Sequence, residues 1–255
     1  MEPWRTGIVQ ASDGEIRIRG YDVLDLMRGA TFTDTICLLH RGQLPTQAER
    51  EMLDALLIAS ADHGSNAPSC ATARMAASGN RGSVSSAIAA GILAIGDQHG
   101  GAGSTCMELI ASGVARAGNE SVTVAEAARA IADEYQAGGQ RLPGLGHRVH
   151  AKDPRTPVLF DMARARGFAG DGIAFMEAIE AVVRDTVKPL PINIDGSLAA
   201  VLYDMKFPAI FGRLLFIVGR VAGLSAEVSE ELSRERAMRI RIAVTYDGEP
   251  PRSLD

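Results

Sequence analysis

The chain has 255 residues, of which 46% are apolar and 22% charged, so it is long enough to bury one large core or two small ones. Its formal net charge of −5 argues against a nucleic-acid-binding protein, which normally shows a basic face, but leaves room for a local basic pocket. We therefore expect a globular protein with no nucleic-acid partner.

Cysteine usage and apolar stretches indicate the compartment. The three cysteines are widely spaced and form no C-x-x-C pair, which favours reduced thiols in a cytoplasmic protein. The first residues contain no apolar signal segment. The most apolar stretch, 207–224, contains Arg213 and Arg220, which would be costly in a bilayer. We interpret it as a buried helix and expect a soluble protein that does not contact membranes.

Apolar spacing predicts a mainly α chain with one small hairpin near its start. Residues 7–20 alternate apolar and polar around Asp13-Gly14, as in a hairpin. Two helix starts are marked by capping boxes, Thr46 with Glu49 and Thr123 with Glu126. Further helices are expected over 21–28, 33–41, 83–96, 104–117, 157–167, 173–187, 197–205, 208–222 and 225–238.

Polar groups gather on loops that interrupt the helical pattern. The segment 144–155 places His147 between glycines and three cations, Arg148, Lys152 and Arg155, which suit carboxylates or phosphates. A basic surface loop is the alternative interpretation. Other glycine-bearing loops carry His63, His99 and Asp195, although Asp195 could simply be an N-cap. We expect no metal site, because no two histidines are spaced i, i+4 and no carboxylate cluster accompanies them.

Five short motifs occur in a single order along the chain: Asp62-His63-Gly64, His99-Gly100-Gly101, Gly146-His147-Arg148-Val149, Asp153-Pro154-Arg155 and Asn193-Ile194-Asp195-Gly196. With these motifs the chain resembles the citrate synthase family, especially its short branch related to citryl-CoA lyase and the lyase module of ATP-citrate lyase. The similarity extends from Asp13-Gly14-Glu15 to Arg220.

The resemblance implies a role for each matching residue. His99 resembles the histidine on the thioester oxygen of acetyl-CoA, His147 the histidine on the ketone of oxaloacetate, and Asp195 the carboxylate that takes a proton from the acetyl methyl group. The substrate carboxylates are expected at His63, Arg155, Arg220 and Arg239, the last supplied across a dimer, with Arg241 as runner-up. Coenzyme A, a substrate carrier and not a permanent cofactor, is expected at Leu145, Gly146, Arg148 and Lys152.

These residue types suit cleavage of citryl-CoA. The reaction needs a base on the tertiary hydroxyl, an acid that stabilises the enol, and a donor that protonates the new methyl carbon. Histidine suits the first two roles. His99 precedes a predicted helix start, whose positive end would keep the imidazole neutral. Arginines match carboxylates because their fork binds two oxygens at once.

Departures from ordinary citrate synthases favour the lyase. Gly196 and Ser197 follow Asp195 where synthases usually carry bulky aromatic residues, and we expect this space to weaken the dry pocket needed to hydrolyse citryl-CoA. The Arg-Pro usual near the C-terminus is also missing. Against the lyase, His99 is present although some lyase modules lack that histidine. The alternatives are citrate synthase, 2-methylcitrate synthase, or a non-catalytic CoA- or carboxylate-binding paralogue.

The resemblance also implies an architecture. We expect a large helical domain of residues 1–100 and 206–255 and a small helical domain of residues 101–205 that closes over the cleft. The site would be completed by a second subunit in a homodimer or higher homo-oligomer. The apolar helix after Ser83 supports this, since it needs a partner surface.

Overall fold

The structure is a computed structural model that describes residues 3–146, 152–186 and 190–253. Within these ranges the chain forms three short strands, β1 (Val9–Ser12), β2 (Glu15–Ile18) and β3 (Tyr21–Asp22). The helices are α1 (Val23–Gly29), α2 (Phe32–Arg41), α3 (Gln47–Ala61), α4 (Pro68–Gly79), α5 (Val84–Leu93), α6 (Ala102–Glu120), α7 (Val124–Ala137), α8 (Arg155–Ala165), α9 (Asp171–Thr186), α10 (Ile194–Asp204) and α11 (Ile210–Arg234). The predicted mainly α class is confirmed.

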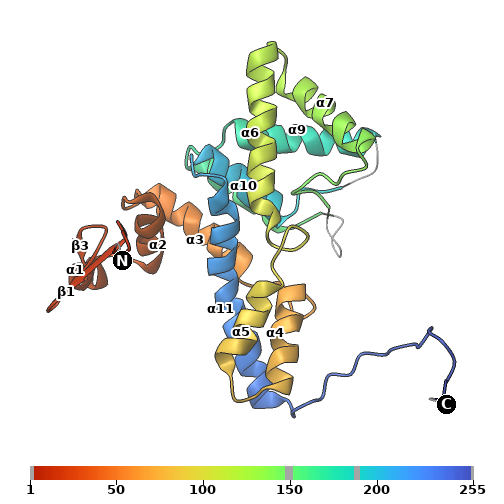
Figure 1. Ribbon diagram of the computed structural model, residues 1–255. Helices are drawn as coiled ribbons and strands as arrows, with labels where there is room; N and C mark the ends of the chain where they lie inside the picture. The colour runs from red at the N-terminus through yellow and green to blue at the C-terminus, as the bar shows by residue number, and fades with distance from the viewer. Residues whose placement is uncertain (1–2, 147–151, 187–189, 254–255) are drawn as a thin grey trace.

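The N-terminal sheet is antiparallel, in the order β1-β2-β3, and projects with α1 to one side of the molecule (Figure 1). Residues Val9 and Ile18 pair across the predicted hairpin, whose turn Gly14 makes with a φ of 75°. The sheet is held to α2 by Arg19, whose Nε and Nη2 donate to the carbonyl of Leu39 at 3.2 and 2.9 Å.

Local capping chemistry explains where several helices begin. Both predicted capping boxes are present, with Thr46 and Thr123 each accepting a hydrogen bond from the backbone N–H of the glutamate three residues on. A third box, Thr31 with Asp34, starts α2. It was not predicted, because the pattern considered required glutamate at the third helical position.

Helix α11 is continuous, so the prediction of two helices over 208–222 and 225–238 is wrong at this point. A Cβ at Gly223 would lie 2.1 Å from the carbonyl oxygen of Ala61, and one at Gly219 would lie 2.9 Å from that of Leu57. These glycines therefore allow α3 to pack against α11 at close range and do not break the helix.

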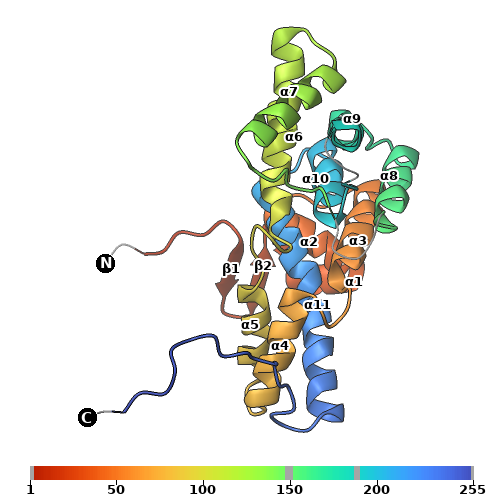
Figure 2. The same cartoon turned by 90° about the vertical axis from the view of Figure 1, so that its right-hand side faces the viewer.

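Helix α11 runs along the molecule and connects two groups of helices (Figures 1 and 2). Helices α4 and α5 lie beside its C-terminal half and enclose a small core of alanines, Cys70, Leu224 and Val228. A larger core joins α6, α9 and α10 with α3 and the first half of α11. Among the described residues, no helix is both long enough and apolar enough to span a bilayer. The division into domains at residues 101 and 206 stays a prediction.

Candidate active site

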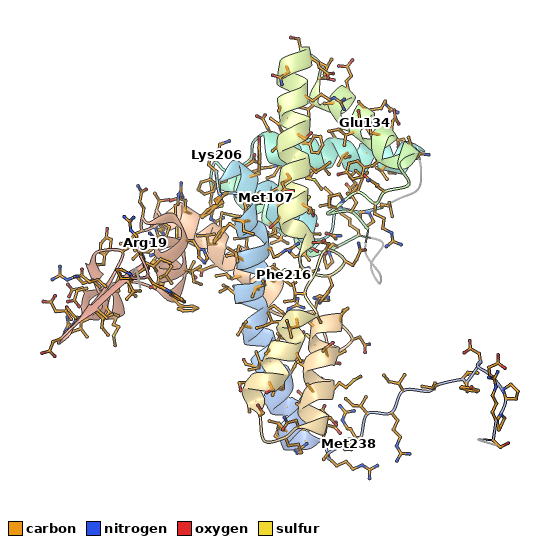
Figure 3. The ribbon with its side chains drawn as sticks, viewed as in Figure 1. Arg19, Met107, Glu134, Lys206, Phe216 and Met238 are labelled. Carbon is orange, nitrogen blue, oxygen red and sulfur yellow. The ribbon has the colours of Figure 1, made fainter. Side chains whose placement is uncertain are left out.

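Three separate segments meet the middle of α11. They are the loop between α3 and α4, the loop between α5 and α6, and the first turn of α10. Phe216, labelled in Figure 3, lies near this meeting point, one helical turn before Arg220. The ring of Phe216 lies under the Arg220 guanidinium at 4.8 Å and meets the ring of His99 edge-on at 6.4 Å.

Arg220 is a fully buried cation whose hydrogen-bond partners among the described residues are neutral, although the charge of Asp62 acts on it. Its Nε donates to the carbonyl of Ser60 at 2.9 Å, its Nη1 to Ser69 Oγ at 3.1 Å, and its Nη2 to His63 Nδ1 at 2.8 Å. In the described parts of the chain no carboxylate forms an ion pair with it, and burial lowers its pKa. A buried charge without a counter-charge is costly, so this position is suited to an anionic ligand.

His63 is held as a neutral hydrogen-bond donor. Its Nδ1 accepts from Arg220, so the ring proton is on Nε2. Desolvation, followed by the charges of Arg220 and Arg155, lowers the pKa of His63 to about 4. The residue as a whole is exposed, so its Nε2–H is a donor available to a carboxylate beside Arg220.

His99 is oriented by Ser69. The backbone N–H of Ser69 donates to His99 Nε2 at 3.2 Å, and Ser69 Oγ lies 2.9 Å from the same nitrogen. Because Nε2 accepts, the neutral ring carries its proton on Nδ1. The next residue, Gly100, has a φ of 70°, and a Cβ there would lie 2.1 Å from the ring of Phe216. In this arrangement the donor of His99 is Nδ1–H; its predicted role toward a thioester oxygen stays a prediction.

Asp195 lies in the first turn of α10 and is not its N-cap, so that alternative is wrong. The cap is Asn193, whose Oδ1 accepts from the backbone N–H of Gly196 at 3.2 Å. Asp195 Oδ1 is buried and has no hydrogen-bond partner among the described groups.

The environment of Asp195 raises the pKa of its carboxyl group. Burial raises the pKa of Asp195 to about 6, although the charges of Arg155 and Arg220 and the backbone of Gly100 act in the opposite direction. A carboxyl group with a pKa near neutrality can both give and take a proton at working pH.

The segment before His147 is joined to the segment before Asp195. The N–H of Gly146 donates to the carbonyl of Pro191 at 2.7 Å, the N–H of Asn193 donates to that of Gly144 at 3.0 Å, and Leu145 pairs with Ile192 as an antiparallel bridge. His147 and Arg148 lie outside the described residues. The predicted CoA positions Leu145 and Gly146 are thus placed beside the start of α10.

The expectation of free space after Asp195 is wrong. A Cβ at Gly196 would lie 2.3 Å from the carbonyl oxygen of Gly144, so backbone atoms occupy the space that a side chain would need. Ser197 is fully buried, and its Oγ lies 2.7 Å from Thr156 Oγ1 and donates to the carbonyl of Asn193 at 3.0 Å. These two residues connect segments of the site and do not enlarge it.

Arg155 lies at the first position of α8, and part of its guanidinium already binds groups of the same chain. Its Nε and Nη2 donate to the two oxygens of buried Asp153 at 2.9 and 2.8 Å, and its Nη1 donates to the carbonyl of Ala59 at 3.0 Å. Two of its five N–H donors are outside these bonds. Its charge acts on both His63 and Asp195, which places it near the cluster. The predicted CoA contact Lys152 is exposed.

Arg239 lies apart from these groups. Its Nε and Nη2 donate to the two oxygens of Glu231 at 2.9 and 2.5 Å, beyond the end of α11. Its neighbour Met238 is labelled at the lower end of the helices in Figure 3, well below Phe216 near the middle. A contribution of Arg239, or of the exposed Arg241, to the site of a second subunit stays a prediction.

The structure adds Ser69, Phe216 and Asn193 to the predicted site. Phe216 and Arg220 are spaced i, i+4 on a helix, a signal from which their contact could have been inferred. Ser69 carries no such signal, because its contacts to His99 and Arg220 join residues distant in sequence.

One group of side chains has the spacing of a metal site. Ligand atoms of Asp62, Cys70 and Glu227 lie within 4.8 Å of one another. However, the Cys70 thiol donates to Asp62 at 3.5 Å, Glu227 accepts from Arg74 at 2.5 Å, and burial raises the pKa of Cys70 to about 11. This chemistry favours a hydrogen-bonded cluster over a set of deprotonated ligands.

Known proteins resemble this arrangement over the whole chain. The citryl-CoA lyase from Hydrogenobacter thermophilus superposes with a TM-score of 0.88 and 39% sequence identity, over 100% of this chain and 98% of that one. A variant of the ATP citrate lyase from Methanosaeta concilii, in complex with (3S)-citryl-CoA, has a TM-score of 0.81 over 98% of this chain and 43% of its own. At 22% identity, the second likeness shows the fold alone.

Sequence comparison agrees. The citrate synthase from Haloferax volcanii is 28% identical over 236 residues, which make up 91% of this chain and 59% of that protein. The chain therefore spans less than two thirds of the length of this relative. The family model described as the citrate synthase C-terminal domain matches residues 46–241. With more than half of its length matched, this chain belongs to the citrate synthase family.

Proposed function

We propose that the protein is a citryl-CoA lyase that cleaves citryl-CoA to acetyl-CoA and oxaloacetate. The observation that carries the proposal is the 39% identity to a citryl-CoA lyase over 100% of this chain and 98% of the other. The cluster around Arg220 supports it, because a buried arginine with neutral partners suits a carboxylate of the citryl group.

Substrate binding follows from the donors that the fold leaves available. The N–H groups of Arg220 that Ser60, Ser69 and His63 do not use would bind one carboxylate, and His63 would donate its Nε2–H to the same substrate from the ring edge away from Arg220. The remaining donors of Arg155 would bind another. The CoA moiety would lie along Leu145 and Gly146, with its phosphates near Arg148 and Lys152. No permanently bound cofactor is required by this chemistry.

Cleavage then needs two proton transfers and one bond rupture. His147 takes the proton of the tertiary hydroxyl, the bond between the carbinol carbon and the methylene carbon breaks, and the carbinol carbon becomes the ketone of oxaloacetate. The electron pair passes into an enolate of acetyl-CoA, whose oxygen accepts a hydrogen bond from Nδ1–H of His99. Asp195 in its protonated form gives its proton to the methylene carbon, and its pKa of about 6 supports this role.

Citrate synthase activity is the second candidate. It is favoured by the relatives named citrate synthase and by the presence of His99 in a donor geometry. The same residues would act in reverse, with ionised Asp195 taking a proton from the acetyl methyl group, and a water molecule would then hydrolyse the citryl-CoA thioester to citrate and free CoA. The two activities therefore differ in the protonation state that Asp195 must have at the start.

We also propose that a second copy of the chain covers the α4–α5 pair. Leu93, Val84 and Met75 on these helices are 85%, 49% and 44% exposed, a large apolar surface for an isolated subunit. Residues 101–205 would close over residues 1–100 and 206–255 within each copy. Light scattering that reports the mass of one chain at micromolar concentration would contradict the dimer.

The test supplies purified protein with citryl-CoA, and separately with acetyl-CoA plus oxaloacetate. We expect oxaloacetate and acetyl-CoA from the first mixture faster than free CoA from the second, and Asp195→Asn should abolish both while still binding CoA. Rapid release of CoA with negligible citryl-CoA cleavage would favour the synthase. CoA binding without either reaction would favour a non-catalytic paralogue.

A further inference from the structure

The side chain of Asn193 joins two segments of the candidate site. Its Oδ1 accepts from the backbone N–H of Gly196 at 3.2 Å, and its Nδ2 donates to the carbonyl oxygen of Gly146 at 2.8 Å. The two partners fix which amide atom is which, because an N–H needs an acceptor and a carbonyl needs a donor. Both the oxygen and the nitrogen of the carboxamide are therefore hydrogen-bonded.

Each end acts on a different proposed catalytic group. The bond to Gly196 N–H holds the first turn of α10, which carries Asp195. The carbonyl of Gly146 belongs to the planar peptide group that leads covalently into His147. Asn193 thus connects the helix turn of Asp195 with the point where the chain enters the His147 segment.

Capping alone does not account for an asparagine at this position. Helices α2, α3 and α7 of the same chain are capped by threonines, whose hydroxyls accept from the backbone as Asn193 Oδ1 does. A serine or aspartate would serve α10 equally well as a cap. A hydroxyl can also accept and donate, but from a single atom one bond closer to the backbone, whereas the carboxamide carries its acceptor and its donor on two separate atoms and so spans both partners.

We propose that Asn193 is a positioning residue that sets the Asp195 turn relative to the segment leading into His147. The roles of Asp195 and His147 rest on the proposed function, whereas the junction itself rests on the geometry. The two segments are in close contact, since a Cβ on Gly144 would lie 2.7 Å from the Cα of Gly196. Backbone bonds from Gly146 to Pro191 and from Asn193 to Gly144 survive without the side chain, so its loss shifts the junction without unfolding it.

The experiment uses Asn193→Ser and Asn193→Asp, which keep an oxygen for the helix cap but remove the Nδ2 amide that donates to Gly146. We expect kcat for citryl-CoA cleavage to fall about 30- to 100-fold in both, because a displacement of about 1 Å at a reacting group has that effect. KM should stay within about twofold, since Arg220 and His63 belong to other elements. The melting temperature should stay within about 2 °C of wild type, because serine and aspartate still cap.

The matched control is Thr123→Ala, which removes the exposed cap of α7 away from the cluster. It should lower the melting temperature and leave kcat unchanged. A wild-type kcat in either Asn193→Ser or Asn193→Asp would overturn the proposal, since helix capping alone would then account for the asparagine.

A second measurement separates this inference from the proposed function. In Asn193→Ser, amide hydrogen exchange should accelerate in peptides covering residues 142–147 and stay slow in the body of α10. If wild type does not cleave citryl-CoA, the proposed function fails, and the exchange result alone decides the junction. Unchanged hydrogen exchange in residues 142–147 would overturn the proposed positioning role of Asn193.

Discussion

Two buried clusters of charged side chains lie along helix α11, and they are built in opposite ways. Near the end of the helix, Arg74 donates to Glu227 at 2.5 Å and to Glu231 at 3.0 Å, and Arg239 binds both oxygens of Glu231. Burial raises the pKa of Glu231, but the bonds and charges of Arg239 and Arg74 lower it more, so the net shift is downward. Each charge in this cluster has a counter-charge.

Around the middle of the helix, Arg220 and Asp195 form no ion pair with any described residue, although their charges act on each other. Arg220 binds Ser60, Ser69 and His63, and Asp195 keeps one oxygen without a partner among the described groups. Burial lowers the pKa of Arg220 and raises that of Asp195, the reverse of the shifts of Arg74 and Glu231.

The difference suggests the hypothesis that the first cluster stabilises the fold and that the second binds a ligand. Paired charges stabilise each other and gain nothing from an added anion. Unpaired charges are a cost to the folded state, and that cost is recovered when a substrate supplies the missing partner. The following substitutions should therefore change binding at one cluster and stability at the other.

The largest effect is expected for Arg220→Met. Losing the buried donor to a substrate carboxylate should lower kcat/KM about 10³-fold. The free energy of unfolding should change by no more than about 1–2 kcal/mol, because removing an unpaired buried charge offsets the hydrogen bonds lost by its neutral partners. Steady-state kinetics and urea unfolding would measure the two. A large stability loss with unchanged kcat/KM would place Arg220 with the structural cluster.

Arg74→Met should behave in the opposite way. Glu231 is fully buried, and without Arg74 only Arg239 remains to balance it. We expect unfolding to become easier by about 3 kcal/mol, the low end for breaking a buried ion pair, with kcat unchanged at temperatures where the variant is folded. If stability is unaffected and turnover falls, the contrast between the clusters does not hold.

The third substitution, Asp195→Asn, tests the cost of an unpaired carboxylate. The pKa of Asp195 is raised from 3.8 to about 6, so the folded state disfavours the ionised form, and stability is lost as pH rises through about 6. The asparagine variant should be more stable than wild type by about 2–3 kcal/mol at pH 8, a gain that disappears below about pH 4. Glu231→Gln is the matched control and should destabilise at pH 8, because the pKa of Glu231 is lowered.

Much of this architecture could be predicted from local patterns. The hairpin around Gly14 and the capping boxes at Thr46 and Thr123 depend on neighbouring residues, and all three are present. The break assigned near Gly223 was wrong because the glycine serves a contact with Ala61, which is distant in sequence.

The candidate site also combines features that local motifs predict with contacts between residues distant in sequence. Motif order predicted His63, His99 and Asp195 on three loops; His63 and His99 lie on loops with their rings 6.0 Å apart, whereas Asp195 lies in the first turn of α10. The space assigned to Gly196 was wrong because the carbonyl of Gly144 fills it. Ser69 was missed for a related reason: its role appears only when the fold brings Arg220 and His99 to either side of its hydroxyl.

The pH dependence of the cleavage rate tests the role of Asp195 through a smaller effect than the substitutions above. Cleavage requires protonated Asp195, so its rate should fall about tenfold per pH unit above the Asp195 pKa of about 6, until another group limits it. A cleavage rate without a break near pH 6 would show that Asp195 does not carry the proton.

The smallest effect is expected for Arg155→Lys, because Arg155 combines features of both clusters. Like Arg74 it is bound by a buried carboxylate, Asp153, at 2.8 and 2.9 Å, yet its side chain is 21% exposed and acts electrostatically on Asp195.

A lysine keeps the charge near Asp153 but cannot hold that carboxylate at two points and still present a planar pair of N–H groups to substrate. We expect KM for citryl-CoA to rise about tenfold, with kcat within about threefold of wild type and unfolding easier by about 1 kcal/mol. The reference is Arg164→Lys, an exposed arginine on the same helix that pairs with Glu177, which should change neither constant. If KM is unchanged while stability falls by more than about 2 kcal/mol, Arg155 belongs with Arg74 as a structural arginine, and Arg220 with His63 must bind the substrate carboxylates without it.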